Sequence, residues 1–361
     1  MLIAEIHSSQ KTVSRVCDEI IAGKYNVYLF GRNIWAGDII DKLGIAGVID
    51  EFTHEKAFKN VPVINNLNAI NPATDIVISC ILGRPWTIKQ KLDARGIRNI
   101  DYFSFWRYCK LDLIDARGWN VFQSHFEESK YEKLSADLGD SESKSTLGNI
   151  VNFRLSQDMS FMKFYPDRQF YQYFEPFLNL SNETFVDVGG FDGLTSFQFV
   201  NYCIDPRKII FFEPDGDNMA EAKSRLASVG CEVDFFQMGL SEKPQQLRFS
   251  NSGSTSTITE NGDIIIDTNS IDNVLQSYPN DDRFYIKMDI EGWELSALEG
   301  ARETIKNKRP KLAICVYHKP NDLLDIYNFV KAINPSYKVY LRHYTEGIDE
   351  TVMYFIPASI A

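Results

Sequence analysis

The amino-acid sequence predicts an α/β protein built from two doubly wound domains, on three observations. Strand-like and helix-like segments alternate over residues 1–110 and again over 181–361, as expected of mostly parallel sheets with helices on both faces. Residues 111–180 separate the two series and are polar, charged and mainly helical in pattern. The chain of 361 residues is also long for a single hydrophobic core. We therefore expect a smaller N-terminal domain, a helical connector and a C-terminal domain with these boundaries.

The N-terminal series alternates short apolar runs with amphipathic runs. In chain order, these are strand 25–31, helix 34–44, strand 46–50, strand 74–82, helix 87–96 and strand 97–103. The first strand ends at Gly31 and the second ends at Asp50. Apolar runs of this length between turn residues are typical of buried strands.

The C-terminal series repeats this alternation and adds a hairpin. In chain order, it contains strand 184–188, helix 193–203, strand 208–213, helix 218–230, strand 231–238, strand 283–289, strand 310–317, helix 322–333 and the paired strands 337–344 and 351–358. The helix at 322–333 places its apolar side chains on one face, which predicts that this face is buried.

Composition and charge limit the class of protein. The net charge is −11 and the pI is near 5.1, which argues against non-specific binding to nucleic acid or to an anionic membrane. No apolar run reaches the length needed to span a bilayer, and the first residues lack the apolar core of a secretion signal. The six cysteines have no C-x-x-C spacing and are expected to be buried free thiols. We expect a cytoplasmic protein with no membrane span and no nucleic-acid partner.

The turn after the first C-terminal strand, at 187–193, reads Asp-Val-Gly-Gly-Phe-Asp-Gly. Dinucleotide folds need G-x-G-x-x-G for the close approach of a pyrophosphate. Here Gly189 and Gly193 follow a D-x-G-x-x-x-G spacing, with Asp187 closing the strand. A carboxylate at this position would repel a phosphate and suits a cation or a nucleoside without phosphate. S-adenosylmethionine is such a ligand, because its amino group and sulfonium are positive.

A second carboxylate, Glu213, ends the next strand. In parallel folds this position holds the ribose hydroxyls of an adenosine, and a carboxylate can accept two hydrogen bonds from them. The order of turn, helix, strand and acid favours a nucleoside site over a purely structural turn.

Five segments resemble the FkbM-type methyltransferase family, whose members are class I S-adenosylmethionine-dependent enzymes. They are FVDVGGFDGLTS, FFEPD, MGLSE, NSIDNVL and YIKMDIEGWELSALEGA, in this order. The resemblance covers about residues 170–361, and KMDIEGWE is its most specific piece. It implies that the C-terminal domain is a doubly wound seven-stranded sheet whose last strand runs antiparallel.

The same resemblance implies which residues contact the cofactor. In chain order, they are Tyr173, Asp187, Gly189, Asp192, Gly193, Glu213, Met238, Gly239 and Asp289. Tyr173 and its two neighbours look like the family's lid over the cofactor. Met238 and Gly239 would lie beside the adenine, and Asp289 would face the methyl group. The sequence has Leu194 where relatives often carry an acid.

Transfer to a hydroxyl acceptor also needs a group that takes its proton. Three candidates stand at strand ends, namely Asp289, His318 and His343. Asp289 ends a central parallel strand, where such folds bind ligands, and it can contact the cofactor instead of acting as the base. The ordinary pKa of histidine suits a base near neutral pH, and a structural role stays open for each histidine.

A divalent metal is a further option, with Asp289, Glu291 and Asp272 as oxygen ligands for Mg²⁺. No spacing in the sequence requires such a site. We therefore do not favour a metal and assign no metal ligands.

The N-terminal turn at 31–37 looks like a degraded dinucleotide turn. Asn33 stands where the second glycine would admit a pyrophosphate, and Gly37 comes one position late. Asp50 would occupy the ribose position. The domain resembles the small Rossmann-like modules that precede some glycan-modifying transferases. Its role stays open between a structural or oligomerising domain and a domain that binds a nucleotide or the acceptor.

The sequence therefore predicts an S-adenosylmethionine-dependent O-methyltransferase. Its expected acceptor is a hydroxyl of a saccharide, either a surface polysaccharide or its precursor, or of another small molecule. The family context suggests polysaccharide biosynthesis by association, and a homo-oligomer can form through the N-terminal domain. Two alternatives stay open: an NAD-dependent nucleotide-sugar oxidoreductase that uses Gly31 and Asp50, and a non-catalytic scaffold that binds the cofactor.

Overall fold

The computed structural model describes residues 9–115, 117–250, 257–258 and 264–358. The chain forms two compact units, each assembled from several stretches of sequence. The first unit contains 1–132, 145–168 and 344–349, and the second contains 133–144, 169–343 and 350–361. Residues 111–180 are thus divided between the units, and the domain boundaries at 110 and 180 stay a prediction.

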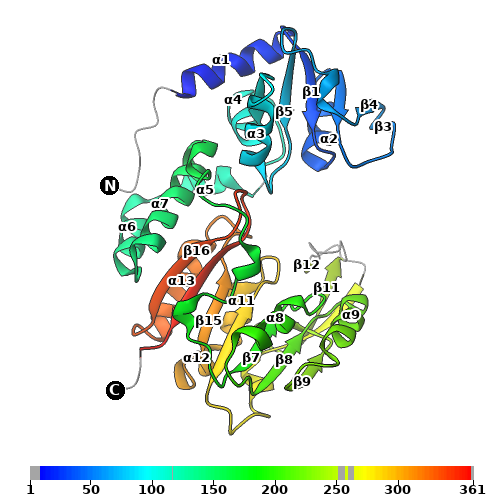
Figure 1. The fold of residues 1–361 in the computed structure, drawn as a ribbon. Coiled ribbons are helices and arrows are strands. Elements are labelled where there is room, and N and C mark those ends of the chain that lie inside the picture. Colours follow the sequence, from blue (N-terminus) through cyan, green and yellow to red (C-terminus); the bar gives the residue numbers. More distant parts are fainter. Residues whose placement is uncertain (1–8, 116, 251–256, 259–263, 359–361) are drawn as a thin grey trace. The chain divides into compact units, whose positions relative to one another are not determined.

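The first unit contains a six-stranded sheet in the order β3-β4-β2-β1-β5-β6, in which only the short β3 pairs antiparallel (Figure 1). Its strands are β1 (Asn26–Phe30), β2 (Gly47–Ile49), β3 (Ala57–Phe58), β4 (Val61–Ile64), β5 (Asp75–Ser79) and β6 (Asn99–Asp101). Its helices include α1 (Ser9–Ile21), α2 (Ile34–Ile40), α3 (Pro85–Asp93), α4 (Tyr102–Tyr108) and α5 (Trp119–His125). Helices α6 (Glu128–Asp137) and α7 (Ser141–Ser156) contribute residues to both units.

Alternate residues of the central strand β1 pack into two different hydrophobic clusters. Val27 and Leu29 pack in a cluster that includes residues of α1 and α4, whereas Phe30 packs with Ile49 and with Leu92 of α3. Because successive side chains of a strand point to opposite faces, both faces of this sheet are covered by helices. Helix α2 ends at Ile40, before the expected end at 44.

The second unit contains a seven-stranded sheet in the order β16-β17-β15-β14-β7-β8-β9. Its strands are β7 (Thr184–Val188), β8 (Lys208–Phe212), β9 (Glu232–Phe236), β14 (Phe284–Met288), β15 (Lys311–Cys315), β16 (Lys338–His343) and β17 (Thr351–Ile356). The last strand, β17, is antiparallel to both of its neighbours, whereas the strands from β15 to β9 pair in parallel. The structure confirms the predicted sheet and its antiparallel last strand.

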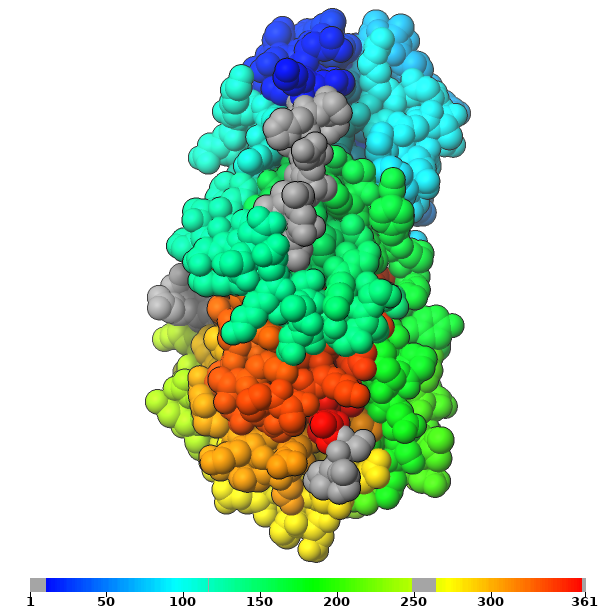
Figure 2. Space-filling model, turned by 90° about the vertical axis from the view of Figure 1, so that its left-hand side faces the viewer, coloured from blue at the N-terminus to red at the C-terminus, as the bar shows by residue number. Residues whose placement is uncertain are grey.

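The helices of the second unit form two groups. Helix α8 (Leu194–Tyr202) contacts α9 (Gly216–Leu226), and contacts also join α10 (Ile271–Leu275), α11 (Glu294–Glu299), α12 (Arg302–Asn307) and α13 (Asp322–Ile333). Part of α13 forms the molecular surface in the orange region of Figure 2, while its Leu323, Ile326 and Val330 are fully buried. None of the helices in the described part of the chain could cross a bilayer.

A small second sheet in this unit was not expected from the sequence. It has the order β10-β13-β11-β12. Its strands are β10 (Gly239–Leu240), β11 (Gln245–Ser250), β12 (Thr257–Ile258) and β13 (Ile264–Asn269).

Three parallel strands of the large sheet end side by side at their carboxyl edge. Met288 of β14, Val188 of β7 and Phe212 of β8 are register neighbours. Asp289 and Glu213 follow directly on their strands, so they flank the glycine turn that follows β7. Open α/β sheets bind ligands at this edge.

Candidate active site

The turn after β7 needs glycine for its conformation and for its packing. Gly189 and Gly193 have positive φ angles of 74° and 80°, which glycine adopts without strain. A Cβ on Gly189 would lie 2.1 Å from the carbonyl oxygen of Asp289, and one on Gly190 would lie 2.1 Å from the ring of Phe211. The missing side chains therefore let the turn pack directly against the end of β14 and against β8.

Asp187, the acid that precedes this turn, is fully buried in an ion pair. Its Oδ1 lies 3.1 Å from Nζ of Lys287, and its Oδ2 accepts a 2.7 Å hydrogen bond from Ser196. The ammonium of Lys287 also donates to the carbonyl of Gly189 at 2.6 Å. Burial alone would lower the pKa of Lys287, but the carboxylates of Asp187 and Asp289 outweigh it and raise the pKa. The charge of Asp187 is thus balanced inside the protein, and its contact with a cofactor stays a prediction.

Glu213 ends β8 and ties this strand to the glycine turn. Its Oε2 accepts a 3.0 Å hydrogen bond from the amide of Phe191, and its Oε1 accepts a 2.9 Å bond from the amide of Asp215. Burial raises the pKa of the Glu213 carboxyl group, and these amide hydrogen bonds oppose the rise only in part. Each carboxylate oxygen keeps a lone pair that can accept a hydrogen bond from a further hydroxyl group.

Three further residues predicted to contact the cofactor lie on the glycine turn and after β9. Asp192 pairs with Arg225 of α9 at 2.5 Å and accepts a 3.0 Å hydrogen bond from the amide of Leu194, so it fixes the start of α8. Met238 and Gly239 follow β9 and are partly buried, and Gly239 begins β10. Both therefore lie one strand beyond Glu213 at the same edge.

Asp289 accepts hydrogen bonds from two tyrosine hydroxyls. Tyr173 donates to its Oδ2 at 3.0 Å and Tyr317 donates to its Oδ1 at 3.2 Å. Burial alone would raise the pKa of Asp289, but the nearby cations Lys287 and His318 outweigh it and hold the pKa below its ordinary value. The carboxylate is therefore ionised, fixed in orientation and about a quarter exposed.

The segment expected to be a lid is held by hydroxyl groups from the sheet. The hydroxyl of Tyr354 accepts a 3.1 Å hydrogen bond from the amide of Tyr173, and Tyr285 donates its hydroxyl to the carbonyl of Tyr173. Gln172 donates to the Tyr173 hydroxyl at 2.9 Å and to Glu350 at 2.6 Å. These contacts place the Tyr173 hydroxyl at Asp289.

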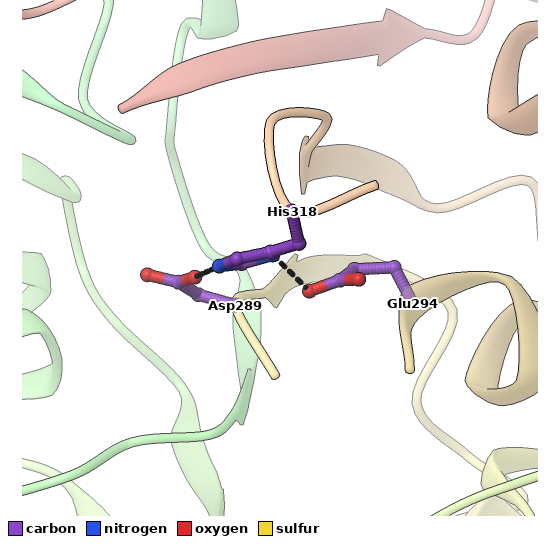
Figure 3. Close-up of side chains that lie close together, drawn as sticks. All are labelled: Asp289, Glu294 and His318. Atoms are coloured by element: carbon purple, nitrogen blue, oxygen red, sulfur yellow. Dashed lines mark ion pairs between the residues drawn. The ribbon is translucent and has the colours of Figure 1, made fainter. Parts of the chain in front are cut away.

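His318, which follows β15, lies among three carboxylates, and Figure 3 shows two of them, those of Asp289 and Glu294. Its Nδ1 lies 2.9 Å from Oε1 of Glu294, and its Nε2 lies 3.5 Å from Oδ1 of Asp289 and 3.5 Å from Oε2 of Glu291. Burial alone would lower the pKa of His318, but Glu294 and the other two carboxylates outweigh it and raise the pKa to about 9. The ring therefore carries its proton at neutral pH, and it must lose this proton before it can act as the predicted base.

The comparisons identify the domain that carries this geometry. Residues 187–337 match the model of the methyltransferase FkbM domain. This segment is an FkbM methyltransferase domain. The chain is also similar to the solved methyltransferase FkbM from Methylobacillus flagellatus KT, with 23% identity and a TM-score of 0.74 over 96% of this chain and 98% of that chain. That likeness shows a shared fold over nearly the whole length.

Two further solved structures each align with 50% of this chain. An rRNA methylase from Streptococcus thermophilus has 15% identity, a TM-score of 0.30 and 90% of its own chain covered. Fibrillarin from Aeropyrum pernix, solved with S-adenosylmethionine, has 9% identity, a TM-score of 0.32 and 68% of its chain covered. No curated protein matches the sequence.

One histidine and one acid that were considered from the sequence lie apart from the His318 group. His343 is the last residue of β16 and is buried, with its Nδ1 2.8 Å from the hydroxyl of Thr351 on β17. Strands β16 and β17 come before β15 in the sheet order, so His343 and His318 are separated by β17. Asp272 accepts hydrogen bonds from the amides of Glu303 and Thr304 at 2.9 and 2.8 Å. Its carboxylate thus caps α12, and Asp272 is not part of the Asp289, Glu294 and His318 cluster found among the described residues.

Sequence reasoning missed two charged residues of the FkbM domain that organise this edge. Lys287 interrupts an otherwise apolar strand, and a lysine in such a run indicates a buried ion pair with an acid on a neighbouring strand. Glu294 is 1% exposed and accepts a 2.9 Å hydrogen bond from the amide of Ile290. Its signal was the third acid of D-I-E-G-W-E, which begins α11.

In the first unit, the two polar residues considered for a dinucleotide bind other residues of the unit. Asp50 pairs with Nε of Arg32 at 2.7 Å. Asn33 caps α2 by accepting a 3.0 Å hydrogen bond from the amide of Ala36 and also donates to the carbonyl of Cys80 at 2.7 Å. A salt bridge thus engages the carboxylate that a ribose would need, and we do not pursue the oxidoreductase alternative.

Proposed function

We propose that the protein is an S-adenosylmethionine-dependent O-methyltransferase that methylates a hydroxyl of a saccharide. The observation that carries this proposal is the row of groups at the carboxyl edge of the FkbM domain. Glu213 after β8 and Asp289 after β14 flank the glycine turn after β7. Two carboxylates on either side of such a turn suit a cationic donor with free ribose hydroxyls.

The residues present fit this donor. Glu213 accepts one amide hydrogen bond on each oxygen and has lone pairs left for ribose hydroxyls. Asp289 is ionised and partly exposed, so it attracts positive charge. Lys287 is buried in its pair with Asp187, and its charge is not offered to a phosphate. When bound, S-adenosylmethionine supplies a methyl group on a sulfonium leaving group.

The chain's own part in the transfer is to orient the acceptor, exclude water and take a proton. We assign proton acceptance to Asp289, because it is ionised and its orientation is fixed by Tyr173 and Tyr317. His318 holds a proton at neutral pH, and His343 is buried against Thr351. The two histidines are therefore the weaker candidates for the base.

A saccharide acceptor is supported by two features. Phe191 of the glycine turn is 41% exposed, and its ring offers an apolar face to a sugar ring. The net charge of −11 disfavours a nucleic-acid acceptor. We propose a cytoplasmic role on a surface polysaccharide or its precursor, with the Rossmann-like first unit binding the acceptor or joining copies of the chain.

Two measurements test this function. Calorimetry should show binding of S-adenosylhomocysteine by the full chain, and the absence of binding would refute the proposal. Incubation with tritiated S-adenosylmethionine and a glycan fraction should transfer label to the glycan. Binding without transfer to any fraction of a cell extract would support the non-catalytic scaffold instead.

A further inference from the structure

We propose that Glu350 is a positioning residue for the donor site of the proposed function. Acting through Gln172, it directs the hydroxyl proton of Tyr173 at Asp289. Gln172 is 5% exposed, and its amide nitrogen donates to Oε2 of Glu350 at 2.6 Å and to the hydroxyl of Tyr173 at 2.9 Å. This hydroxyl in turn donates to Oδ2 of Asp289 at 3.0 Å. The link to donor binding rests on the proposed function, whereas the direction of these hydrogen bonds does not.

The carboxylate of Glu350 fixes the direction of the first hydrogen bond. An ionised carboxylate only accepts hydrogen bonds, whereas an amide side chain has an NH2 group that donates and an oxygen that accepts. The amide of Gln172 must therefore turn its nitrogen to Glu350, and the same nitrogen carries a second N–H for Tyr173. With its oxygen turned to Glu350 instead, two acceptors would face each other without a proton between them.

The hydroxyl of Tyr173 is then left with one direction for its own proton. It accepts from Gln172, and it stays protonated because burial and then the charge of Asp289 raise the pKa of Tyr173 well above its ordinary value. Oδ2 of Asp289 lies 3.0 Å from this hydroxyl, and Sγ of Cys315 lies 3.2 Å from it. A thiol sulfur is a weak acceptor and an ionised carboxylate is a strong one. The proton therefore points to Asp289 and holds this carboxylate in one orientation.

The backbone at Tyr173 and Glu350 has a conformation that residues with a side chain rarely adopt. Their φ angles are 72° and 68°, in the left-handed region that disfavours residues with a Cβ. Two further residues at the carboxyl edge of the sheet share this feature, Phe191 with 50° and Glu291 with 53°. Strained residues of this kind persist where the surrounding contacts enforce them, and they cluster at ligand sites. Glu350 thus has the backbone conformation typical of a residue that serves a site.

The test exchanges the two side chains, because a simple contact and a fixed direction then give different results. Glu350→Gln keeps the size of the side chain, but its new amide can donate to the oxygen of Gln172 and lets that amide turn over. The double variant Gln172→Glu with Glu350→Gln restores a hydrogen bond between the two positions, but it places an acceptor instead of a donor on Tyr173.

The readout is the Cζ signal of Tyr173 in ¹³C nuclear magnetic resonance of the full chain with labelled tyrosine. Its absence in Tyr173→Phe identifies this signal. We expect the signal to move in both Glu350→Gln and the double variant, because the hydroxyl no longer donates to Asp289 alone. Calorimetry should show that both variants bind S-adenosylhomocysteine about three- to tenfold more weakly than the parent.

The matched control is Asp267→Asn, which removes a carboxylate that accepts a 3.0 Å hydrogen bond from Gln246 in the small sheet. It should leave the Tyr173 signal and the affinity unchanged. The proposal is overturned if Glu350→Gln leaves the signal in place, or if the double variant restores the signal of the parent. Where the double variant does not fold, Gln172→Glu alone also places an acceptor on Tyr173 and should move the signal. The signal is recorded without donor, so a parent chain that binds no S-adenosylhomocysteine refutes the proposed function and leaves this test intact.

Discussion

Asp187 and Lys287 lie opposite each other on the parallel strands β7 and β14, with 3.1 Å between Oδ1 and Nζ and both side chains nearly inaccessible to solvent. Lys287 also binds the carbonyl of Gly189, so the pair joins the glycine turn to the strand that ends at Asp289. We infer that this buried pair holds the two halves of the proposed donor site in register.

Replacing the lysine should therefore destabilise the protein. Lys287→Met leaves the charge of Asp187 buried without a counter-ion, and removal of one partner of a buried pair costs about 3–5 kcal/mol. Urea unfolding should show a loss of this size. The double variant Lys287→Met with Asp187→Asn removes both charges and should recover part of the loss. A single variant as stable as the parent would show that the pair is not a stabilising contact.

The close packing of the turn predicts a sharp difference between two glycines. Gly189→Ala places a Cβ against the carbonyl of Asp289 at a φ of +74°, so it should lower the free energy of unfolding by about 2 kcal/mol or more and weaken donor binding. Gly230 has open space around it and no left-handed φ, and Gly230→Ala should change stability by less than about 0.5 kcal/mol. Equal losses in both variants, measured by unfolding and calorimetry, would contradict this account.

The hydroxyl of Tyr173 should matter for donor binding through Asp289. Tyr173→Phe removes a hydrogen bond to an ionised carboxylate, and we expect the affinity for S-adenosylhomocysteine to fall about tenfold. Tyr278 donates a similar 2.7 Å bond to Asp234 near the amino end of β8. Tyr278→Phe should therefore leave the affinity unchanged. The hydroxyl has no part in the site if Tyr173→Phe binds the ligand as well as Tyr278→Phe.

A salt bridge in the second unit predicts an acid dependence of stability. Burial alone would raise the pKa of Asp140, but hydrogen bonds from Arg342 and Ser143 outweigh it and lower the pKa from 3.8 to about 2. Because the pKa is lower in the folded state, the stabilisation is present above pH 3.8 and is lost as the pH falls towards 2.

Asp140→Asn removes this titration and is the matched variant. Unfolding measured from pH 5 down to about pH 2 should show a smaller loss of stability in Asp140→Asn than in the parent, because the variant lacks the carboxyl group that titrates between 3.8 and about 2. Parallel losses in the two proteins would rule out the assigned role of Asp140.

The sequence predicted those features that depend on local pattern. The period of apolar residues located the strands β7, β8 and β14, and turn and strand-end chemistry selected Glu213 and Asp289. Lys287 was missed because its partner lies on a strand far away in the sequence, and their register exists only in the folded sheet. A local pattern in the sequence cannot predict a pairing between residues on two such distant strands.

The roles of the two histidines also could not be predicted from the sequence, because they depend on the charges and strands that surround them in the fold. An isolated histidine suits a base near neutral pH, but three carboxylates from different segments surround His318 and raise its pKa to about 9. His343 also follows a strand pattern, and only the pairing of β16 with β17 separates it from His318. The small sheet that contains β10 and β13 likewise depends on pairing between distant segments.

The most direct test of the central claim is a crystal structure of the protein soaked with S-adenosylhomocysteine. The account predicts an adenosine at the carboxyl edge of the large sheet, with its ribose hydroxyls on Glu213 and its amino-acid end towards Asp289. A ligand bound at any other edge or in the first unit, with the turn at 187–193 unchanged and uncontacted, would contradict it.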